Sequence, residues 1–527
     1  MIFYWLSSMS RRRFGSQLAA LFLSKVMAWL FSAFSREKRQ DRGGEACESD
    51  TSSGVCAEST SNTSWEVSML DSREAPMPPE DALLLLQDGN ARFVKGTPMA
   101  VRTNDAARCN KVDLEQPPHA AIVGCSDCCA LETIFDSLPG DIYAFKNAGN
   151  TLTHASGSMV ASLEFCVDLG CRLILVLGHS PCIALEDATK AYFQRHSCGD
   201  SALNNLLYDL GEAVQETIAD TSADAAEVAL RAVPVNVFHT ADLLLKFSRA
   251  IREKVSGGEL QVQGAVFDSK TGKVEFLGRS PREAEILKSD APAPVWPDAV
   301  DDEMPAPECQ SLRLAPEEAL SRLRDGNLRF VDGAVWQQDL CPAAQHHCAV
   351  LACADARVPV DVIFNAAPGE IFVMKNAGNT CTHSAGSIMS SLEFSVTKLG
   401  VRLVLILGHT PCTAMTVCCK QAHAAHDEDV ELEQPLMQSL SAAASQAEHE
   451  LGEGSRPPPS GSSPEEISKH AVKLNVFHVI ESIFATSQIL RSLAKNSTLQ
   501  VQGGLYHMET GNVEFLGRLP HEEQVLE

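Results

Sequence analysis

Short apolar runs bounded by glycine alternate along the chain with segments of helical periodicity. The apolar runs lack the alternating polar positions of a half-exposed strand, and such runs are typical of strands buried on both faces of a parallel sheet. They are HAAIV (119–123), LILVL (173–177), CAVLA (348–352) and LVLIL (403–407). Apolar residues at helical spacing predict helices over 80–94 and 317–331.

Further helices and a pair of strands complete this pattern. The segment SMVASLEFCVDLG (158–170) and its later counterpart predict crossover helices that end at Gly170 and Gly400. Residues 201–219 also have helical apolar spacing, and VQGAVFDSKTGKVEFLG (262–278) predicts two strands around a turn at the sheet edge. The fold class is therefore α/β, with a mainly parallel sheet flanked by helices.

The chain repeats itself once, which predicts a tandem duplication of one domain. The matching segments are 79–96 with 316–333, 145–165 with 374–394, 172–182 with 402–412, 235–239 with 474–478, and 260–279 with 499–518. We place domain 1 at 76–287 and domain 2 at 312–522. The acidic, Pro-rich segment 288–311 is a linker, and domain 2 carries an insertion near 426–466 that we predict to be disordered.

The first 40 residues have the composition of a targeting leader. Residues 1–36 contain no Asp or Glu but several Arg and Ser, and Lys25 interrupts the apolar run, so no stable membrane span is expected. The pattern favours an organellar leader, plastid before mitochondrion; a secretory signal or signal-anchor is the alternative. Residues 41–75 form a linker rich in Ser, Thr and Glu.

Charge and cysteine usage narrow the class of protein. The net charge of −25 argues against a nucleic-acid-binding surface. The 18 cysteines do not form the pattern of a small secreted disulfide framework, and many lie in apolar stretches as buried small residues. This usage favours a reducing compartment.

Each domain carries one early Cys and a later His-x-x-Cys at the carboxyl ends of its predicted strands. Open α/β sheets place their sites at this edge. Two thiolates and one imidazole suit Zn²⁺ and leave a fourth position free for catalysis. A closed zinc site or no metal is the alternative for a single such motif, but its repetition favours zinc in both domains. The ligand sets are Cys353, His409 and Cys412 in domain 2, and Cys125, His179 and Cys182 in domain 1.

A carboxylate and a guanidinium follow the first cysteine in domain 2. Asp355 lies two residues after Cys353 and Arg357 two residues further, so on an extended segment all three point the same way. Arg357 can then hold Asp355 through a bidentate contact; a plain surface ion pair is the alternative. Domain 1 keeps Asp127 but has Cys129 where domain 2 has the arginine.

This combination resembles the β-class carbonic anhydrases. The resemblance rests on Cys-x-Asp-x-Arg, Gly-His-x-x-Cys, DGNxRFV, KNAGNT and TGxVEFLG, and it covers nearly all of 76–285 and 312–520. The tandem form is similar to that of some algae. It implies an intramolecular pseudo-dimer, further homo-dimerisation being open, in which the copies complete each other's clefts.

The same resemblance implies the function and the roles of the site residues. The expected reaction is the reversible zinc-dependent hydration of CO2 to bicarbonate and a proton, with one zinc ion per domain. Asp355 orients the nucleophile, and Arg357 keeps Asp355 away from the metal. In the family's closed state this aspartate becomes the fourth ligand. We therefore expect domain 2 to carry most of the activity, and Asp127 to close the zinc site of domain 1.

Other interpretations stay open at this point. Another arginine could replace the missing one in domain 1, or its pocket could accept carbonyl sulfide or carbon disulfide. The chain could also be a bicarbonate-responsive scaffold without catalysis.

Several further residues stand at matched positions in the two copies. His154 and His383 could shuttle protons, although a hydrogen bond within the loop is the favoured interpretation. Lys146 and Lys375 could line the cleft. The remaining matched residues are predicted to be structural or to let the backbone approach the site; they are His239, His478, and the pairs Gly149–Asn150 and Gly378–Asn379.

Overall fold

The computed structural model describes residues 76–97, 117–138, 140–194, 201–218, 224–289, 314–332, 346–428, 434–453 and 463–527. All of these described residues belong to one compact unit. The predicted leader (1–40) and linker (41–75) lie outside the described residues, as does nearly all of the linker 288–311.

Domain 1 alternates strands and helices as its apolar runs predict. Its strands are β1 (Ala120–Cys125), β2 (Ile142–Asn147), β3 (Leu173–Ser180), β4 (Gln261–Asp268) and β5 (Val274–Gly278). Its helices are α4 (Pro79–Lys95), α6 (Leu131–Ile134), α7 (Ser158–Asp168), α8 (Ile183–Gln194), α9 (Ala202–Thr217), α10 (Ala225–Phe247), α11 (Arg249–Ser256) and α12 (Glu283–Ile286). The crossover helix α7 ends where predicted, because Gly170 has a φ of +105° and its amide hydrogen-bonds back to Val167.

Domain 2 repeats this order. Its strands are β6 (Cys348–Cys353), β7 (Ile371–Asn376), β8 (Leu403–Thr410), β9 (Gln500–His507) and β10 (Val513–Gly517). Its helices are α13 (Pro316–Val331), α14 (Val360–Ile363), α15 (Ser387–Thr397), α16 (Thr413–Glu428), α17 (Pro435–Glu453), α18 (Pro464–Thr486), α19 (Gln488–Lys495) and α20 (Glu522–Leu526).

The prediction that the insertion near 426–466 is disordered is wrong for much of its length. Helix α17 occupies it and buries an apolar stripe against α16 and α18; its most buried members include Leu436, Met437, Leu440 and Ala444. These residues recur at i, i+1, i+4 and i+8, which is the spacing of one helical face. Residues 454–462, in the Pro/Gly/Ser end of the insertion, lie outside the described part of the chain.

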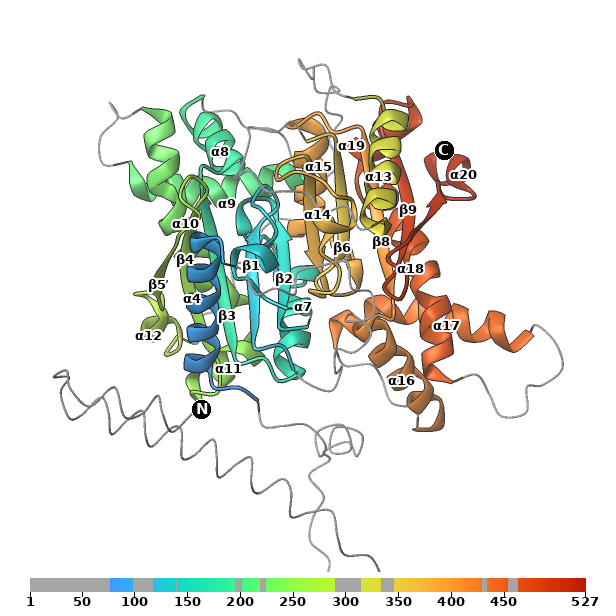
Figure 1. Cartoon of the computed structure of the whole chain (residues 1–527), viewed down its shortest axis with the longest axis horizontal. Coiled ribbons are helices and arrows are strands. Elements are labelled where there is room, and N and C mark those ends of the chain that lie inside the picture. The colour runs from blue at the N-terminus through green and yellow to red at the C-terminus, as the bar shows by residue number, and fades with distance from the viewer. Residues whose placement is uncertain are drawn as a thin grey trace, which may run out of the picture. The chain divides into compact units, whose positions relative to one another are not determined.

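One ten-stranded sheet runs through both domains in the order β10-β9-β8-β6-β7-β2-β1-β3-β4-β5. Within each domain the strands are parallel except for the edge hairpin, β4–β5 or β9–β10, as predicted. At the centre, β2 and β7 run antiparallel, with Lys146 opposite Lys375. The two halves lie side by side in Figure 1, in blue-green and in orange to red. This arrangement is the intramolecular pseudo-dimer that the resemblance implied.

The two central strands were not predicted. Each is a six-residue segment, IYAFKN or IFVMKN, whose apolar residues continue into a buried lysine and asparagine. A lysine inside an apolar run argues against a buried strand unless a charged partner is known. For Lys375 the charged partner, Glu132, comes from the other domain. Lys146 instead contacts the carbonyls of Cys128 and Cys129, earlier in its own domain. In neither case does the short sequence window contain the partner.

Reciprocal hydrogen bonds join the crossover helices to the opposite domain. The buried hydroxyl of Ser162 on α7 accepts from the amide of Ala377 at 3.0 Å, and that of Ser391 on α15 accepts from Ala148 at 2.8 Å. Each bond reaches the loop that follows the other domain's central strand. Since buried amides without partners are costly, these serines tie each domain's loop to its neighbour.

A buried ion pair also crosses the interface. The ammonium nitrogen of Lys375 lies 2.6 Å from Oε1 of Glu132 in domain 1, and their side chains are 2% and 11% exposed. Lys375 additionally donates to the carbonyl of Val358 at 3.0 Å. The sequence suggested that Lys146 and Lys375 line the cleft. Both are instead buried at the centre of the interface.

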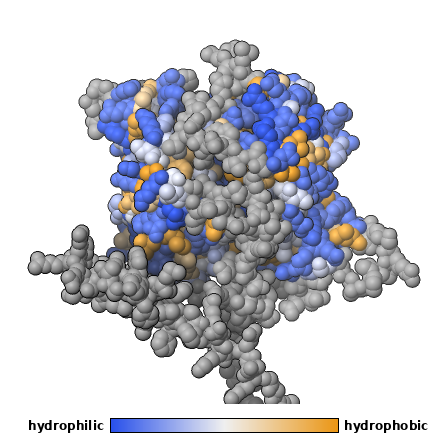
Figure 2. Space-filling view, viewed as in Figure 1, coloured by the Kyte–Doolittle hydropathy of each residue, from blue (hydrophilic) through white to orange (hydrophobic). Residues whose placement is uncertain are grey.

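Helices cover both faces of the sheet, with α4 and α13 standing in front of the two halves in Figure 1. The described part of the surface in Figure 2 is mainly hydrophilic, with small apolar patches. Helix α10 has the length and composition of a membrane span, but 72% of its apolar window is buried in the protein. It packs on β3 and β4, so it is a core helix.

Glu132→Gln should destabilise the protein by about 3 kcal/mol, because removing one partner leaves the Lys375 ammonium buried without its countercharge. Urea unfolding at pH 7 measures this change. The matched control is Asp187→Asn, whose partner Lys190 is 59% exposed and whose loss should cost about 0–1 kcal/mol. An equal loss of unfolding free energy in the two variants would contradict the claim that the buried pair stabilises the interface.

Candidate metal centres and the comparison with known proteins

The two predicted ligand sets are each brought together at one end of the central sheet. Cys125 is the last residue of β1, and His179 lies in β3, two strands from the domain interface. Cys182 follows directly and precedes α8. The strands extend slightly further than predicted, so both His179 and its counterpart His409 lie within a strand rather than after one.

In both domains the ligand atoms converge. In each set, the two sulfur atoms and the histidine nitrogen all lie within 4.8 Å of one another. In domain 1 the sulfur atoms of Cys125 and Cys182 are 3.8 Å apart. All six ligand residues are buried. Within the described residues, no further group of this kind was found.

The donor sets fit a zinc ion. Nε2 of His179 and both ring nitrogens of His409 are buried, with no hydrogen-bond partner among the described residues. A buried unpaired ring nitrogen is costly unless another group binds it. Two soft thiolates and one imidazole are typical zinc donors.

In each set the pKa of one thiol is lowered and that of the other is raised. The pKa of Cys353 lies well below its usual value, because Cys412 donates a hydrogen bond to it and the charge of His409 favours the thiolate. The pKa of Cys412 is correspondingly raised. A sulfur that already favours the thiolate state is a ready metal ligand.

In domain 1 the loop after the central strand is held against a ligand by a backbone contact. The amide of Gly149 donates to Sγ of Cys125 at 3.2 Å, and Gly149 has a φ of +67°. A Cβ atom here would also lie 2.9 Å from a methyl carbon of Leu210. The amide of Asn236 on α10 holds the Gly149 carbonyl at 2.8 Å. The prediction that this glycine brings the backbone close to the site is therefore confirmed.

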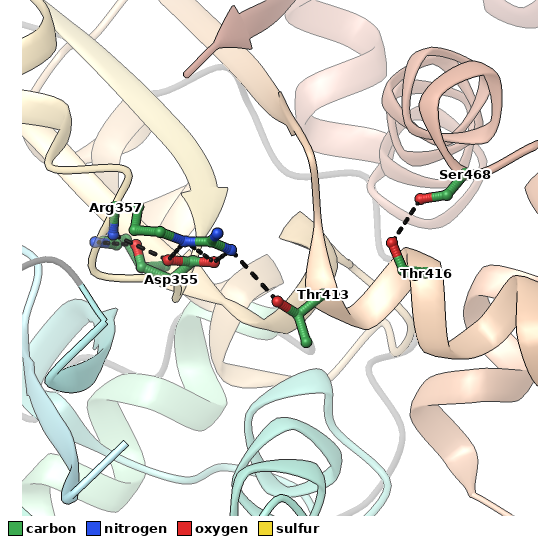
Figure 3. A network of polar contacts seen from close by, with 6 residues as sticks. Asp355, Arg357, Thr413, Thr416 and Ser468 are labelled. Atoms are coloured by element: carbon green, nitrogen blue, oxygen red, sulfur yellow. Dashed lines mark hydrogen bonds and ion pairs between the residues drawn. The ribbon is translucent and has the colours of Figure 1, made fainter. Parts of the chain in front are cut away.

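Domain 2 contains the predicted carboxylate–guanidinium pair. Nε of Arg357 lies 2.8 Å from Oδ1 and 3.0 Å from Oδ2 of Asp355, and Nη2 contacts Oδ2 as well. Nη2 also donates to the hydroxyl of Thr413 at 3.3 Å, as Figure 3 shows. Asp355 and Arg357 are 4% and 3% exposed, so this is a buried pair rather than a surface one. Thr413, at the start of α16, was not identified from the sequence.

Burial raises the pKa of Asp355, but the charge and the hydrogen bonds of Arg357 lower it more, so the pKa lies well below its usual value. The same contacts raise the pKa of Arg357. Asp355 is thus a carboxylate at neutral pH, and both of its oxygens are engaged by the guanidinium.

Domain 1 has no such pair. Cys129 stands at the arginine's position and is buried, and its carbonyl and that of Cys128 face Nζ of Lys146 at 3.5 and 2.6 Å. Oδ2 of Asp127 accepts from the amide of Ile183 at 3.4 Å and lies 4.0 Å from Nε2 of His179. Asp127 is therefore beside the ligand set, and no guanidinium of the described residues contacts it.

Residues of the opposite domain reach both sites, as the resemblance implied, although the sequence did not show which residues these are. Tyr143 of β2 pairs through its backbone with Asp355, and the amide of Ala144 donates to the carbonyl of Ala354 at 2.8 Å. On the other side, the amide of Val373 donates to the carbonyl of Ser126 at 3.4 Å. No periodicity within one domain could have shown these contacts, because they exist only after β2 and β7 pair.

The other matched histidines have structural contacts. The rings of His154 and His383 stack on each other at 3.7 Å across the domain interface. Each Nδ1 accepts a backbone amide two residues later, at 3.1 Å, so the predicted loop hydrogen bond is confirmed. His239 contacts Asp209 at 3.2 Å, and His478 contacts Gln446 at 2.8 Å.

Comparison with known proteins agrees with this geometry. A family model described as carbonic anhydrase matches residues 120–274 and 348–513, together more than half of the chain. The chain belongs to the carbonic anhydrase family. Because the family's reaction is the reversible hydration of CO2, this carbonic anhydrase is a carbonate dehydratase.

Relatives match one copy at a time. Carbonic anhydrase 2 of Mycobacterium tuberculosis is 30% identical over 198 residues, 37% of this chain and 91% of the relative. A carbonic anhydrase of Helicobacter pylori strain 26695 is 26% identical over 179 residues, 32% of this chain and 74% of the relative. Each thus covers less than half of this carbonic anhydrase, as expected for a duplicated chain.

Solved structures of the β class are also similar. The Coccomyxa β-carbonic anhydrase in complex with acetazolamide has 28% identity and a TM-score of 0.28, covering 33% of this chain and 72% of that one. The β-carbonic anhydrase CafA of Aspergillus fumigatus has 24% identity and a TM-score of 0.29. The match covers 35% of this chain and 80% of that one.

Arg357→Gln should destabilise the folded protein by about 3–5 kcal/mol at pH 7, because the Asp355 carboxylate stays buried without its partner. The lowered pKa of Asp355 stabilises the folded state at any pH above the pKa of this carboxyl in the unfolded chain, which is ~3.9. This contribution is lost progressively as the pH falls below that value. The difference in the free energy of unfolding between the parent protein and the variant should therefore become smaller below about pH 4.

Urea unfolding at pH 7 and at pH 3 checks both parts of this prediction. Arg518→Gln is the control, because Arg518 pairs with Glu522 at the surface, is 48% exposed, and should contribute about 0–1 kcal/mol. The prediction would be refuted if, at pH 7, Arg357→Gln lowered the free energy of unfolding by no more than Arg518→Gln does.

Proposed function

We propose that domain 2 carries most of the CO2 hydration, and that domain 1 also holds a zinc ion but is largely closed. The observation behind this assignment is the bidentate contact of Arg357 with Asp355, which domain 1 lacks. Cys353, His409 and Cys412 would hold one zinc ion and Cys125, His179 and Cys182 the other.

Zinc, when bound, supplies a Lewis acid that lowers the pKa of a water molecule to about 7. The chain's own residues set the conditions around it. Asp355 stays ionised, so one of its oxygens can accept a hydrogen bond from the nucleophile and orient it. Arg357 engages the carboxylate through its fork, which opposes the binding of Asp355 to the metal. Thr413 accepts from the same guanidinium and fixes its direction.

In domain 1 the balance is different. Asp127 faces the ligand set without a guanidinium to compete for it, and a carboxylate beside a divalent cation favours the metal. A charge-assisted contact contributes about 1.5–3 kcal/mol, which corresponds to a roughly 10- to 100-fold change between open and closed populations. This difference supports a closed first site and an open second site.

Inactivating the two sites separately tests the assignment. Cys353→Ser should lower the CO2 hydration rate of the leaderless chain by at least about 100-fold, whereas Cys125→Ser should leave more than about half of it. Each variant should lose one of two zinc ions per chain. Stopped-flow hydration and metal analysis measure these outcomes. Cys418→Ser is the control, since Cys418 is buried near α17 outside both ligand sets. A Cys353→Ser protein as active as the parent would refute the proposal.

Restoring the guanidinium should open the first site. In the Cys353→Ser protein, adding Cys129→Arg should raise the residual hydration rate by about tenfold or more, because the new cation competes with the metal for Asp127. The reciprocal change, Arg357→Cys in the Cys125→Ser protein, should lower the rate by a similar factor. Unchanged rates in both proteins, with full zinc content, would show that the cation does not control the site.

A further inference from the structure

The contacts of Asp127 differ from those of Asp355 at more than the missing arginine. In domain 2 the network is Asp355, Arg357 and Thr413. In domain 1 the aligned residues are Asp127, Cys129 and Ile183, so both the guanidinium and the hydroxyl that accepts from it are absent. Neither replacement side chain can hold a carboxylate in the way the arginine does.

A residue of domain 2 lies beside the other oxygen of Asp127. Nε2 of His346 lies 3.2 Å from Oδ1 of Asp127, while Oδ2 accepts the amide of Ile183. His346 is 3% exposed, and its ring packs edge-on against Phe372 of β7, with the ring centroids 5.5 Å apart. The imidazole is thus held by domain 2 and directed at the carboxylate of domain 1.

The histidine is present in only one copy. His346 precedes β6 by two residues, and the aligned residue of domain 1 is Pro118, which has no side-chain donor. Domain 1 therefore offers no such histidine to Asp355 of domain 2, which already has Arg357. Domain 2 does offer His346 to Asp127 of domain 1, which lacks the arginine.

An imidazole beside Oδ1 of Asp127 competes with whatever else would bind the same oxygen.

We propose that His346 is a positioning residue for the first site, holding Asp127 in the place of the missing arginine so that domain 2 completes the zinc site of domain 1. This inference rests on the proposed binding of a metal ion by Cys125, His179 and Cys182. One imidazole contact is weaker than a bidentate guanidinium fork, so the first site remains mainly closed, and His346 sets how strongly Asp127 is drawn to the metal.

The test uses the full chain with Cys353→Ser, loaded with Co²⁺, so that the visible absorption bands report the domain 1 site alone. Azide, titrated into this protein, competes with Asp127 for the fourth coordination position. His346→Ala should weaken the apparent azide affinity by about tenfold, because Asp127 is released to the metal. His346→Gln keeps a side-chain N–H donor and should restore the affinity to within about threefold.

Two further variants separate positioning from a structural effect. His347→Ala removes the neighbouring buried histidine and should leave the azide affinity unchanged. In a protein carrying Asp127→Asn, His346→Ala should have no effect on azide binding, because the competing carboxylate is gone. The comparison of the Asp127→Asn protein with and without His346→Ala also tests the inference if the protein with His346→Ala alone folds poorly.

The outcomes distinguish the inference from the proposed function. If Cys353→Ser binds no cobalt, both are wrong. If cobalt binds but His346→Ala and the parent have azide affinities within twofold of each other, only the inference is wrong. An equal effect of His346→Ala with and without Asp127→Asn would likewise overturn it.

Discussion

The antiparallel pairing of β2 with β7 is the contact on which both sites depend. It places Lys146 opposite Lys375 at the centre of a single ten-stranded sheet. It also brings Tyr143 against Asp355 and the strand that carries Phe372 against the domain 1 loop. Without this pairing each domain would have an exposed central edge and an incomplete site, so each domain requires a second copy beside it.

Polar groups buried at this interface specify the register of the two domains. Ser162 and Ser391 accept amides of the opposite loops, and Lys375 meets Glu132. A one-residue slip would leave these donors and acceptors unpaired in an apolar environment, at a cost of about 1–3 kcal/mol for each group. The interface therefore tolerates little displacement, and the two metal centres keep a fixed relation to the strands that complete them.

The two copies have diverged around one carboxylate. Cys129 and Ile183 replace the partners that Arg357 and Thr413 provide in domain 2, while the ligands to the proposed zinc are kept. His346 stands beside Asp127 from the other domain. A duplicated chain can distribute a site between its halves in this way, because each half carries its own sequence, whereas in a homodimer every change appears in both sites.

The sequence by itself determined the duplication, the parallel strands, the edge hairpins and the two Cys-His-Cys sets, since local apolar periodicity and ligand spacing are properties of neighbouring residues. It also predicted the contact of Arg357 with Asp355, two residues apart. It missed β2, β7 and helix α17, and the roles of Tyr143, Thr413 and His346. Only the tertiary structure decided these, because each depends on a partner far away in the chain: a buried lysine is acceptable in β7 only when Glu132 of the other domain faces it, and His346 meets Asp127 only across the paired central strands.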